Sequence, residues 1–478
     1  MYFRQRKSAC RKAFFLLLLL LADVLPFNAQ AQTEVAVKKQ DETEQSVIAV
    51  SETKTAVKPL VVSVLPNYYN AQDGVSIKEL IKRALESNLE LAAARFEIEK
   101  AKARLQQARL KPNPTLEFEQ QSGRLVGNGG EGSFSIGASL PVEIYGRREA
   151  RVNFANIEIE ASLAEVRNRE RALAANILTN YSSALGALRE LDSLEKILEL
   201  DLQTAKFVQI RVNEGEIAPL EFNLLQAEIE RLRARHQLAE GKLQSSLTQI
   251  KLLAGIPFDE SIQLREQITT AILPALPSTS ELALEIALKT RPDLFLAQIE
   301  EQAATAGLRL IRAQSKPDLT AYSRFSQGNS SIDLPTGAYP QQRDRRLTFG
   351  VAIGIPIFNK NQGAKAEAEI SIKQAQHRRE FTEKAIRSEI LSAYQRFEAA
   401  SRAVSTLQNA AIPRSMENVE TFRKVYEIGE IKITDLIAEQ RRLLDMNRDL
   451  TDALTEKYRA QADLQIASGA SALLPEPK

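Results

Sequence analysis

The chain has few of the residues from which catalytic and metal sites are built. Its 478 residues include no tryptophan, two histidines and one cysteine, and aromatic side chains make up only 6%. Beyond Cys10 there is no thiol, which excludes a disulfide, a cysteine-ligated metal and a thiol nucleophile. His236 and His377 lie on separate helical stretches among arginine, glutamine and glutamate, so we interpret both as solvated helix residues. The sequence therefore predicts no enzyme and no bound cofactor or metal.

Residues 1–31 have the three parts of a secretory signal peptide. A basic start precedes an apolar run over residues 13–22, and Ala29-Gln30-Ala31 is a small-x-small cleavage site. A membrane anchor is the alternative, but the apolar run is about half the ~20 residues that a spanning helix needs. Cys10 precedes the run, so it is not placed for lipid attachment after cleavage.

The rest of the sequence lacks an apolar run long enough to cross a membrane as a helix. An exported chain of this kind is periplasmic, secreted or inserted as a β-barrel. An excess of one charge is also missing. Removing residues 1–31 takes away five of the 63 basic and one of the 61 acidic side chains, which leaves a net charge of −2. This balance gives no reason to expect nucleic-acid binding.

The composition is that of long helices. Alanine, leucine, glutamate, glutamine and arginine are abundant, which favours narrow packing seams over a wide globular core. No proline interrupts residues 146–214, and this stretch would span about 100 Å as a helix. Helices are predicted over residues 76–110, 146–214, 218–254, 363–428 and 434–468, with Pro413 as a kink in the fourth. Such lengths imply antiparallel coiled-coil packing.

Two equivalent turns organise the chain. Gly-Glu-Ile begins at Gly215 and again at Gly429, and an acidic residue, Glu221 or Asp435, follows each glycine six positions later. Glycine supplies the left-handed residue that ends a helix, so each turn is predicted to join two long antiparallel helices.

The residues around the two turns also repeat, which predicts duplication of a whole architectural half. We divide the chain into a signal peptide (1–31), a flexible N-terminal arm (32–72), a first repeat (73–258), a linker (259–278), a second repeat (279–470) and a C-terminal tail (471–478). The arm is treated as flexible because it is polar and has no sustained hydrophobic period.

Apolar residues alternate with small or polar ones in four stretches, two in each repeat. Strands are predicted over residues 115–122, 133–142, 318–326 and 346–357. The residues predicted to face lipid are Phe134, Ile136, Leu347, Phe349 and Val351, with Gly350 on the lumen side. Two soluble hairpins with one buried face would show a similar pattern. Export and the lengths, which are close to those of tilted membrane strands, favour membrane strands.

Four strands do not close a membrane barrel, because the smallest known barrels have about eight and an open sheet edge does not face lipid. Oligomerisation is therefore required. Three chains give about 12 strands, whereas a dimer gives about eight, whose interior side chains nearly fill. The sequence thus predicts a mainly α-helical fold with a small membrane β-barrel part, in which three chains complete a 12-stranded barrel.

The duplicated helix–hairpin–helix half, the four strands and the paired turns resemble the TolC family of outer-membrane efflux proteins. The resemblance covers about residues 75–470. Residues 141–148, Pro-Val-Glu-Ile-Tyr-Gly-Arg-Arg, are similar to the segment after the second strand in the family's heavy-metal, CzcC-like branch. The resemblance implies a homotrimeric conduit with a barrel in the outer membrane and a helical barrel crossing the periplasm. It also implies docking onto a periplasmic adaptor and an inner-membrane pump of the RND type.

The same resemblance implies positions for individual residues. Gly215 and Gly429 would lie at the periplasmic end, where Glu221 and Asp435 would surround the entrance. Six carboxylates in a trimer would concentrate cations in a narrow mouth, whereas the alternative is that each acid only stabilises its helix N-terminus. Four prolines would mark strand–helix junctions: Pro112, Pro141, Pro317 and Pro356.

Alternatives to a metal-cation efflux duct stay open from the sequence alone. A type I secretion duct or a drug-efflux duct would have the same architecture, and a non-channel periplasmic coiled-coil scaffold would share the long helices. A hydrolase would need clustered acid–base or nucleophilic residues that the sequence does not offer. Residues 127–132 spell G-x-G-x-x-G, but the motif leads into a strand rather than a helix, so we predict a hairpin loop outside the cell.

Overall fold

A computed structural model of the chain describes residues 63–122, 131–331 and 341–468, which all belong to one compact unit. The elements are η1 (Leu65–Asn67), α2 (Ile77–Ser87), α3 (Leu89–Arg109), β1 (Thr115–Ser122), β2 (Gly132–Val142), α4 (Arg147–Asn213), α5 (Pro219–Ala254), α6 (Ser280–Thr290), α7 (Pro292–Gln314), β3 (Asp318–Ser331), β4 (Gln341–Gly354), α8 (Gln362–Thr406), the π-helix η2 (Leu407–Ala411), α9 (Ile412–Glu427) and α10 (Ile433–Ala467). The predicted signal peptide, residues 32–62 of the predicted arm, residues 127–130 of the glycine-rich motif and the predicted tail lie outside the described residues.

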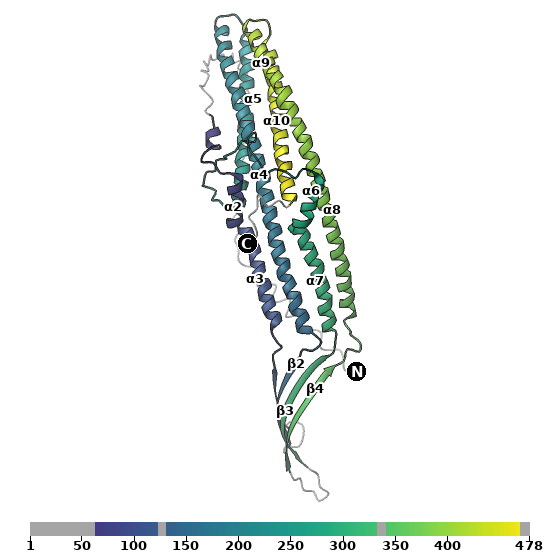
Figure 1. The fold of residues 1–478 in the computed structure, drawn as a ribbon. Helices are drawn as coiled ribbons and strands as arrows, with labels where there is room; N and C mark the ends of the chain where they lie inside the picture. The colour runs from purple at the N-terminus through teal and green to yellow at the C-terminus, as the bar shows by residue number, and fades with distance from the viewer. Residues whose placement is uncertain (1–62, 123–130, 332–340, 469–478) are drawn as a thin grey trace, which may run out of the picture. The chain divides into compact units, whose positions relative to one another are not determined.

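The expected fold class is confirmed: long helices and one four-stranded sheet, arranged as two similar halves (Figure 1). Each half consists of a helical segment, a β-hairpin and a pair of long helices that return on each other. Among the described residues, no helix combines the length and the apolar character needed to cross a membrane.

Helix α4 lies at the centre of the helical part and contacts α3, α5, α7 and α10. Its 67 residues span about 100 Å. Most of its buried side chains are alanine, leucine or isoleucine, such as Ile177, Leu185 and Leu191, and these three are completely or almost completely buried. The four long helices predicted from the sequence begin and end within one residue of their expected bounds, apart from the interruption described next.

That interruption lies in the second half, where α8 gives way to the π-helix η2 and then to α9. Pro413 lies in the first turn of α9 and has no backbone N–H to continue the helical hydrogen bonds. One extra residue per turn in η2 accommodates it. The kink predicted at Pro413 thus coincides with an interruption of the α-helical hydrogen bonding.

The predicted continuous helix over residues 76–110 was wrong, because Asn88 divides it into α2 and α3. The Asn88 backbone is extended, with ψ 121°, and its side chain accepts a hydrogen bond from the N–H of Leu91 across 2.8 Å. The same amide donates to the carbonyl of Leu253 on α5 across 2.9 Å. In the second half, Arg291 before Pro292 makes the equivalent break between α6 and α7.

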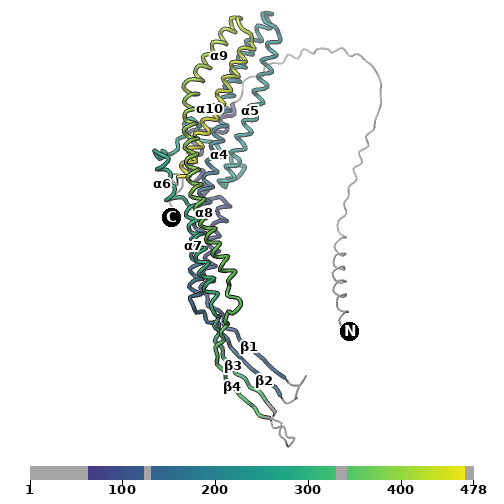
Figure 2. Tube along the Cα trace, turned by 90° about the vertical axis from the view of Figure 1, so that its right-hand side faces the viewer, coloured from purple at the N-terminus to yellow at the C-terminus, as the bar shows by residue number. Residues whose placement is uncertain are grey.

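The four strands form one antiparallel sheet in the order β1-β2-β3-β4, so β1 and β4 are its two edges (Figure 2). The predicted bounds of the last two strands were wrong. Strand β3 extends to Ser331 rather than residue 326, and β4 runs from Gln341 to Gly354 rather than over 346–357. Their outer ends are polar on both faces, so hydrophobic alternation does not reveal them, and Pro356 follows the last paired residue.

Strand register divides the sheet into two chemically different faces. Gly137 pairs with Glu117 and Arg324, and Arg324 pairs with Thr348, so these four side-chain positions share one face. The opposite face carries exposed apolar side chains from all four strands: Leu116, Phe118, Phe134, Ile136, Leu140, Phe325, Leu347, Phe349, Val351 and Ile353. The predicted pattern of apolar and small or polar faces is thus present in the sheet.

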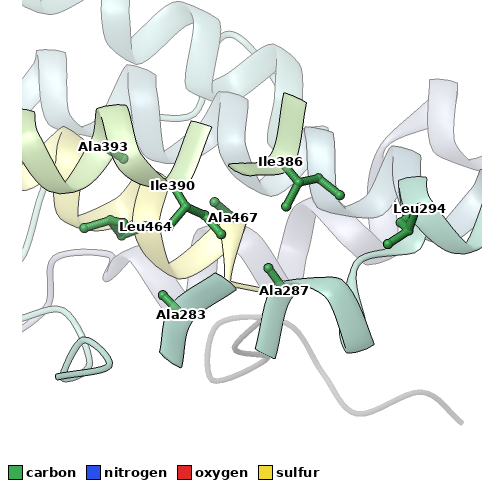
Figure 3. Close-up of a cluster of buried hydrophobic side chains, with 8 residues drawn as sticks. All are labelled: Ala283, Ala287, Leu294, Ile386, Ile390, Ala393, Leu464 and Ala467. Carbon is green, nitrogen blue, oxygen red and sulfur yellow. The ribbon is translucent and has the colours of Figure 1, made fainter. Parts of the chain in front are cut away.

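A compact apolar cluster packs α6 and α7 against α8 and α10 midway along the helical part (Figure 3). Its members are Ala283, Ala287, Leu294, Ile386, Ile390, Ala393, Leu464 and Ala467. Half of them are alanines, so the helices approach closely and each methyl group fills little space. All four helices belong to the second half, so this packing joins its short helices to its long ones.

Residues 63–72 are packed against the helices, which corrects the prediction that the flexible arm extends to residue 72. The carboxylate of Glu195 on α4 accepts hydrogen bonds from the Ser63 hydroxyl (2.6 Å) and the Val64 N–H (3.0 Å). The Tyr68 hydroxyl donates to Glu240 on α5 across 2.7 Å. Leu264 in the predicted linker forms bridges with Tyr69 and is fully buried, so the linker is packed too.

Candidate functional site

The two tip turns join the long helices at the end away from the sheet (Figure 1). Both turns have the same hydrogen-bonded geometry. Gly215 and Gly429 both have a positive φ, of 76° and 85°. The N–H after each glycine donates to a carbonyl five residues earlier, at Arg211 (2.9 Å) and Val425 (3.1 Å). This is the Schellman arrangement, which only glycine adopts without strain. The internal duplication therefore extends to individual backbone hydrogen bonds.

A side-chain hydrogen bond joins the two tips. The hydroxyl of Tyr426, at the end of α9, donates to the Glu221 carboxylate in the first turn of α5 across 3.1 Å. Tyr426 is only 2% exposed, and burial followed by the nearby Glu221 carboxylate raises the pKa of its hydroxyl. Arg211 adds a weaker contact from α4 to the Tyr426 carbonyl at 3.5 Å, and its Nε donates to Glu216 across 2.9 Å.

The two predicted entrance carboxylates have different surroundings. Asp435 is exposed, and its carboxylate accepts a hydrogen bond from the N–H of Lys432, at the start of α10, across 3.3 Å. Glu221 is half-buried and engaged by Tyr426. The duplication explains the difference, because Val212 occupies the position of Tyr426 in the first half and has no hydroxyl to offer.

Below the tips, two carboxylates are buried between α4, α5 and α10. Glu228 is 4% exposed and accepts hydrogen bonds from Arg231 and Arg441, both at 3.1 Å from Nε. Burial opposes ionisation of Glu228, but these two arginines hold its pKa below the usual value. Asp201 on α4 is 1% exposed, and neither of its carboxylate oxygens has a hydrogen-bond partner of good geometry among the described residues. Burial and then the Glu228 charge raise the pKa of Asp201 to about 7, although the Gln440 side chain lies close enough to oppose this shift slightly.

At the other end of the helices, Arg147 at the start of α4 holds the end of α7. Its guanidinium donates to the carbonyls of Ala313 (3.1 Å) and Pro317 (3.2 Å), and also contacts the carbonyl of Lys316 and the carboxylate of Asp318. One of these carbonyls belongs to the last turn of α7, where carbonyls lack intrahelical partners, and the other two lie in the short connection to β3.

Two further arginines of α4 hold the end of α3 in the same way. Arg148 donates to the carbonyl of Arg109 (2.9 Å), and Arg151 donates to those of Ala108 (3.0 Å) and Leu110 (3.1 Å). Positive side chains near a helix N-terminus oppose the helix dipole. The position of these arginines is therefore explained by their hydrogen bonds to the ends of α3 and α7 and not by stabilisation of α4 itself. We call Arg147, Arg148 and Arg151 the junction arginines.

The four predicted junction prolines lie beside these contacts. Pro112 is between α3 and β1, Pro317 between α7 and β3, and Pro356 between β4 and α8. Pro141 is the second-last residue of β2 and is paired with Thr320, so it lies within the strand end rather than after it.

The two histidines differ, and the interpretation of His236 as solvated was wrong. Its Nε2 lies 3.2 Å from Glu195, and its side chain is 12% exposed. His236 thus belongs to the cluster that holds residues 63 and 64. His377 is 80% exposed, as expected for a solvated residue. Within the described residues, no group of three or more histidine, cysteine, aspartate or glutamate side chains is placed to hold a metal ion.

Sequence reasoning brought out the tip glycines and acids but missed Tyr426, Asp201 and the junction arginines. Comparing the two repeats offered a signal for Tyr426, since an aromatic residue replaces Val212 at the equivalent place. Arg147 and Arg148 were noticed only as part of a sequence motif. Nothing local distinguishes Asp201, because its burial depends on helices far away in sequence.

The sequence model of the family described as "Outer membrane efflux protein" matches residues 80–256 and 283–470. The chain belongs to the outer membrane efflux protein family. The two matched segments correspond to the two halves of the fold. Members of this family are outer-membrane components of tripartite efflux systems, and this efflux protein lies in the outer membrane with its helical part in the periplasm.

Among the curated relatives are a metal-resistance protein and a cation efflux protein. The cobalt-zinc-cadmium resistance protein CzcC of Cupriavidus metallidurans is 24% identical over 416 residues, covering 86% of this chain and 93% of the relative. The cation efflux system protein CusC of Escherichia coli (strain K12) is 24% identical over 413 residues, covering 82% and 87%. The pyoverdine export outer membrane protein OpmQ of Pseudomonas aeruginosa is 26% identical over 345 residues, covering 68% and 70%.

Solved structures share the fold of this efflux protein. A crystal structure of CusC aligns with a TM-score of 0.68 at 23% identity, covering 87% of this chain and 97% of that one. The outer membrane protein VceC of Vibrio cholerae aligns with a TM-score of 0.67 at 18% identity, covering 82% and 96%. The predicted TolC-type architecture is thereby confirmed.

Proposed function

We propose that three copies of this chain form a passive duct that carries metal cations out of the periplasm. The observation that supports it most is the sheet: one face is apolar and exposed on all four strands, and both edges, β1 and β4, are unpaired within the described chain. An unpaired edge is not tolerated in lipid, so each β4 pairs with β1 of the next copy. Three sheets then give about 12 strands and a lumen lined by the polar face.

The metal cargo is proposed from the relatives. CzcC and CusC are named for resistance to cobalt, zinc and cadmium and for cation efflux, and the match to CzcC covers nearly all of both chains. The chain itself supplies no metal-binding group among its described residues, which suits a duct that does not retain its cargo. Selection of the metal and the energy for export then belong to partner proteins, and the duct has no catalytic role.

We further propose that the tips dock onto a periplasmic adaptor and, through it, onto an inner-membrane pump of the RND type. Glu221 and Asp435 would surround the entrance there, with Asp435 as the more accessible carboxylate and Glu221 tied to Tyr426. In this arrangement the Tyr426–Glu221 hydrogen bond favours a closed entrance, because it holds the α4–α5 tip against the α9–α10 tip.

Two measurements test the proposal. Native mass measurement of the protein extracted from outer membranes is expected to give three chains, and a stable monomer would contradict the assembly. A strain lacking the gene should become sensitive to cobalt, zinc or cadmium and regain resistance when the gene is restored. Recovery of the protein only from the soluble periplasm would instead favour the coiled-coil scaffold.

The similarity to OpmQ supports a second candidate cargo, a siderophore or another organic molecule. The same deletion strain separates the two. Unchanged metal tolerance together with loss of siderophore export or increased antibiotic sensitivity would favour an organic cargo, including that of a drug-efflux or type I secretion duct.

A further inference from the structure

One ionic contact on the polar face of the sheet crosses an intervening strand. Arg324 on β3 donates to Glu117 on β1, with 3.0 Å between Nη2 and Oε2, and its Nη1 lies 3.5 Å from Glu119. Strand β2 lies between them, so the Cα atoms of Arg324 and Glu117 are two strand spacings, or about 10 Å, apart. The arginine side chain therefore lies flat across the sheet instead of pointing away from it.

The residues underneath are small enough to allow this. Gly137 stands between Glu117 and Arg324 in the same row of the sheet. A Cβ atom at Gly137 would lie 3.6 Å from Nε of Arg324, so the guanidinium chain rests directly on this glycine. Its neighbour Ser135 is only 8% exposed, although it faces away from the apolar side. Gly137 and Ser135 are thus the buried residues of β2, and the side chain of Arg324 lies over this part of the strand.

This contact adds little to stability, because the three side chains remain 43–54% exposed and exposed ion pairs contribute about 0–1 kcal/mol. Its effect is on charge. Glu117 and Glu119 are the acidic side chains that β1 presents on the polar face, and Arg324 is the basic group beside them. Two further ion pairs of the described residues involve this face, Arg346 with Asp344 within β4 and Arg147 with Asp318 at the helix end of the sheet, and each is neutral by itself.

We propose that Arg324 sets the ion preference of the sheet part of the duct by acting as a tethered counter-ion for Glu117 and Glu119. This rests on the proposed function, which makes the polar face the lumen. Three copies place six carboxylates around one level of the lumen, and carboxylates concentrated in this way attract and retain multivalent cations. Each Arg324 occupies two of them, so cations leaving the duct pass this level without being held. Arg324 is in this sense a specificity-determining residue for release.

The test measures block of single channels in planar bilayers by hexaamminecobalt(III), an inert trivalent cation, added from the sheet side or from the tip side. Ionic strength is kept low so that the Debye length exceeds about 10 Å. Arg324→Gln should lower the half-blocking concentration from the sheet side about tenfold and leave tip-side block unchanged. Adding Glu117→Gln in the same chain returns the net charge at this level from −2 to the wild-type −1 per chain, so the half-blocking concentration should return to the wild-type value.

Arg345→Gln is the matched control, because it removes the same charge from the other face of β4, in the row of Gln327. It should leave sheet-side block unchanged. If Arg324→Gln does not assemble, the Glu117→Gln, Glu119→Gln variant with Arg324 intact should weaken sheet-side block and shift permeability toward anions. Channels of normal conductance in which neither Arg324→Gln nor the double variant changes sheet-side block would overturn the inference. Absence of any channel in the wild-type protein would instead contradict the proposed function.

Discussion

The hydroxyl of Tyr426 and the carboxylate of Glu221 lie 3.1 Å apart, 205 residues apart in sequence, and form a hydrogen bond between the two tips of the chain. Their twins in the duplicated halves, Val212 and Asp435, are chemically unable to repeat it. Each chain therefore has one such bond and not two. The two halves of the fold are similar, but this hydrogen bond between their tips is not repeated. It lies where the duct is expected to open.

Removing this link should open the duct. Tyr426→Phe deletes the donor hydroxyl but keeps the buried ring, so the change should cost about 1–3 kcal/mol of tip closure without disturbing the helices. We expect higher single-channel conductance in bilayers and greater sensitivity of cells to large antibiotics. Val212→Phe is the matched control, since it places the same ring at the twin position. Conductance in Tyr426→Phe equal to that of the wild type would show that the hydrogen bond does not hold the tips closed.

The face assignment of the sheet is tested at two neighbouring residues of β4. Val351 is 57% exposed on the apolar face, so Val351→Arg should cost about 2–4 kcal/mol of barrel stability if that face meets lipid. Ala352→Arg places the same side chain on the polar face, in a row away from Arg324, and should fold nearly normally. Heat resistance of the trimer on gels and urea unfolding in lipid vesicles measure both. Equal stability of the two variants would mean that the apolar face does not contact lipid.

The packing of Tyr322 against Gly350 on the polar face allows a further test by channel conductance. A Cβ atom at Gly350 would lie 2.5 Å from the ring of Tyr322, so the tyrosine lies flat on this glycine. Gly350→Ser should push the ring into the lumen and lower conductance while the trimer remains intact. Normal conductance would indicate that Tyr322 moves along the sheet and not into the pore.

Much of the fold is visible in the sequence because long helices and membrane-facing strands obey strict periods. The helix from Arg147 to Asn213 and both glycine turns were predicted within a residue. What failed depended on contacts between distant segments. Asn88 divides a helix because its side chain meets Leu253, and His236 is largely shielded from solvent because it packs beside Glu195 on α4. The tips were predicted as a pair of turns, but their hydrogen bond needed the two halves placed side by side.

Asp201 makes stability depend on pH. Its folded pKa of about 7 lies above the ordinary value of 3.8, so the folded protein binds the proton more tightly than the unfolded chain does. The contribution of Asp201 to the free energy of unfolding is therefore most favourable below about pH 4. It declines as pH rises from about 4 through 7, by at most a few kcal/mol per chain. This group should therefore lower the melting temperature of the wild type between pH 5 and pH 8, in addition to the effects of other titrating groups.

Asp201→Asn separates this group from the others, because asparagine keeps the shape and cannot ionise. The variant should be more stable than the wild type at pH 8 and should lose part of the decline between pH 5 and 8. Asp192→Asn is the matched control, since Asp192 lies on the same helix and its side chain is 38% exposed beside Lys196. Identical pH profiles for the wild type and Asp201→Asn would show that the buried carboxyl is neutral, or fully compensated, throughout this range.

The entrance charge is best tested at Asp435, because it is exposed and makes no side-chain contact with the other tip in the described structure. Three copies would place three carboxylates at the mouth, where they concentrate cations most strongly at low ionic strength. Asp435→Asn should reduce the cation preference of the resting channel and weaken block by multivalent cations from the tip side. Adding Glu221→Gln should strengthen both effects but also raise conductance, since it removes the acceptor for Tyr426.

Asp452→Asn is the control, as it changes the same charge on α10 about 25 Å further along the helix. If Asp435→Asn and Asp452→Asn give the same reversal potential and the same block, Asp435 serves only to stabilise the start of α10, where its carboxylate accepts the Lys432 N–H.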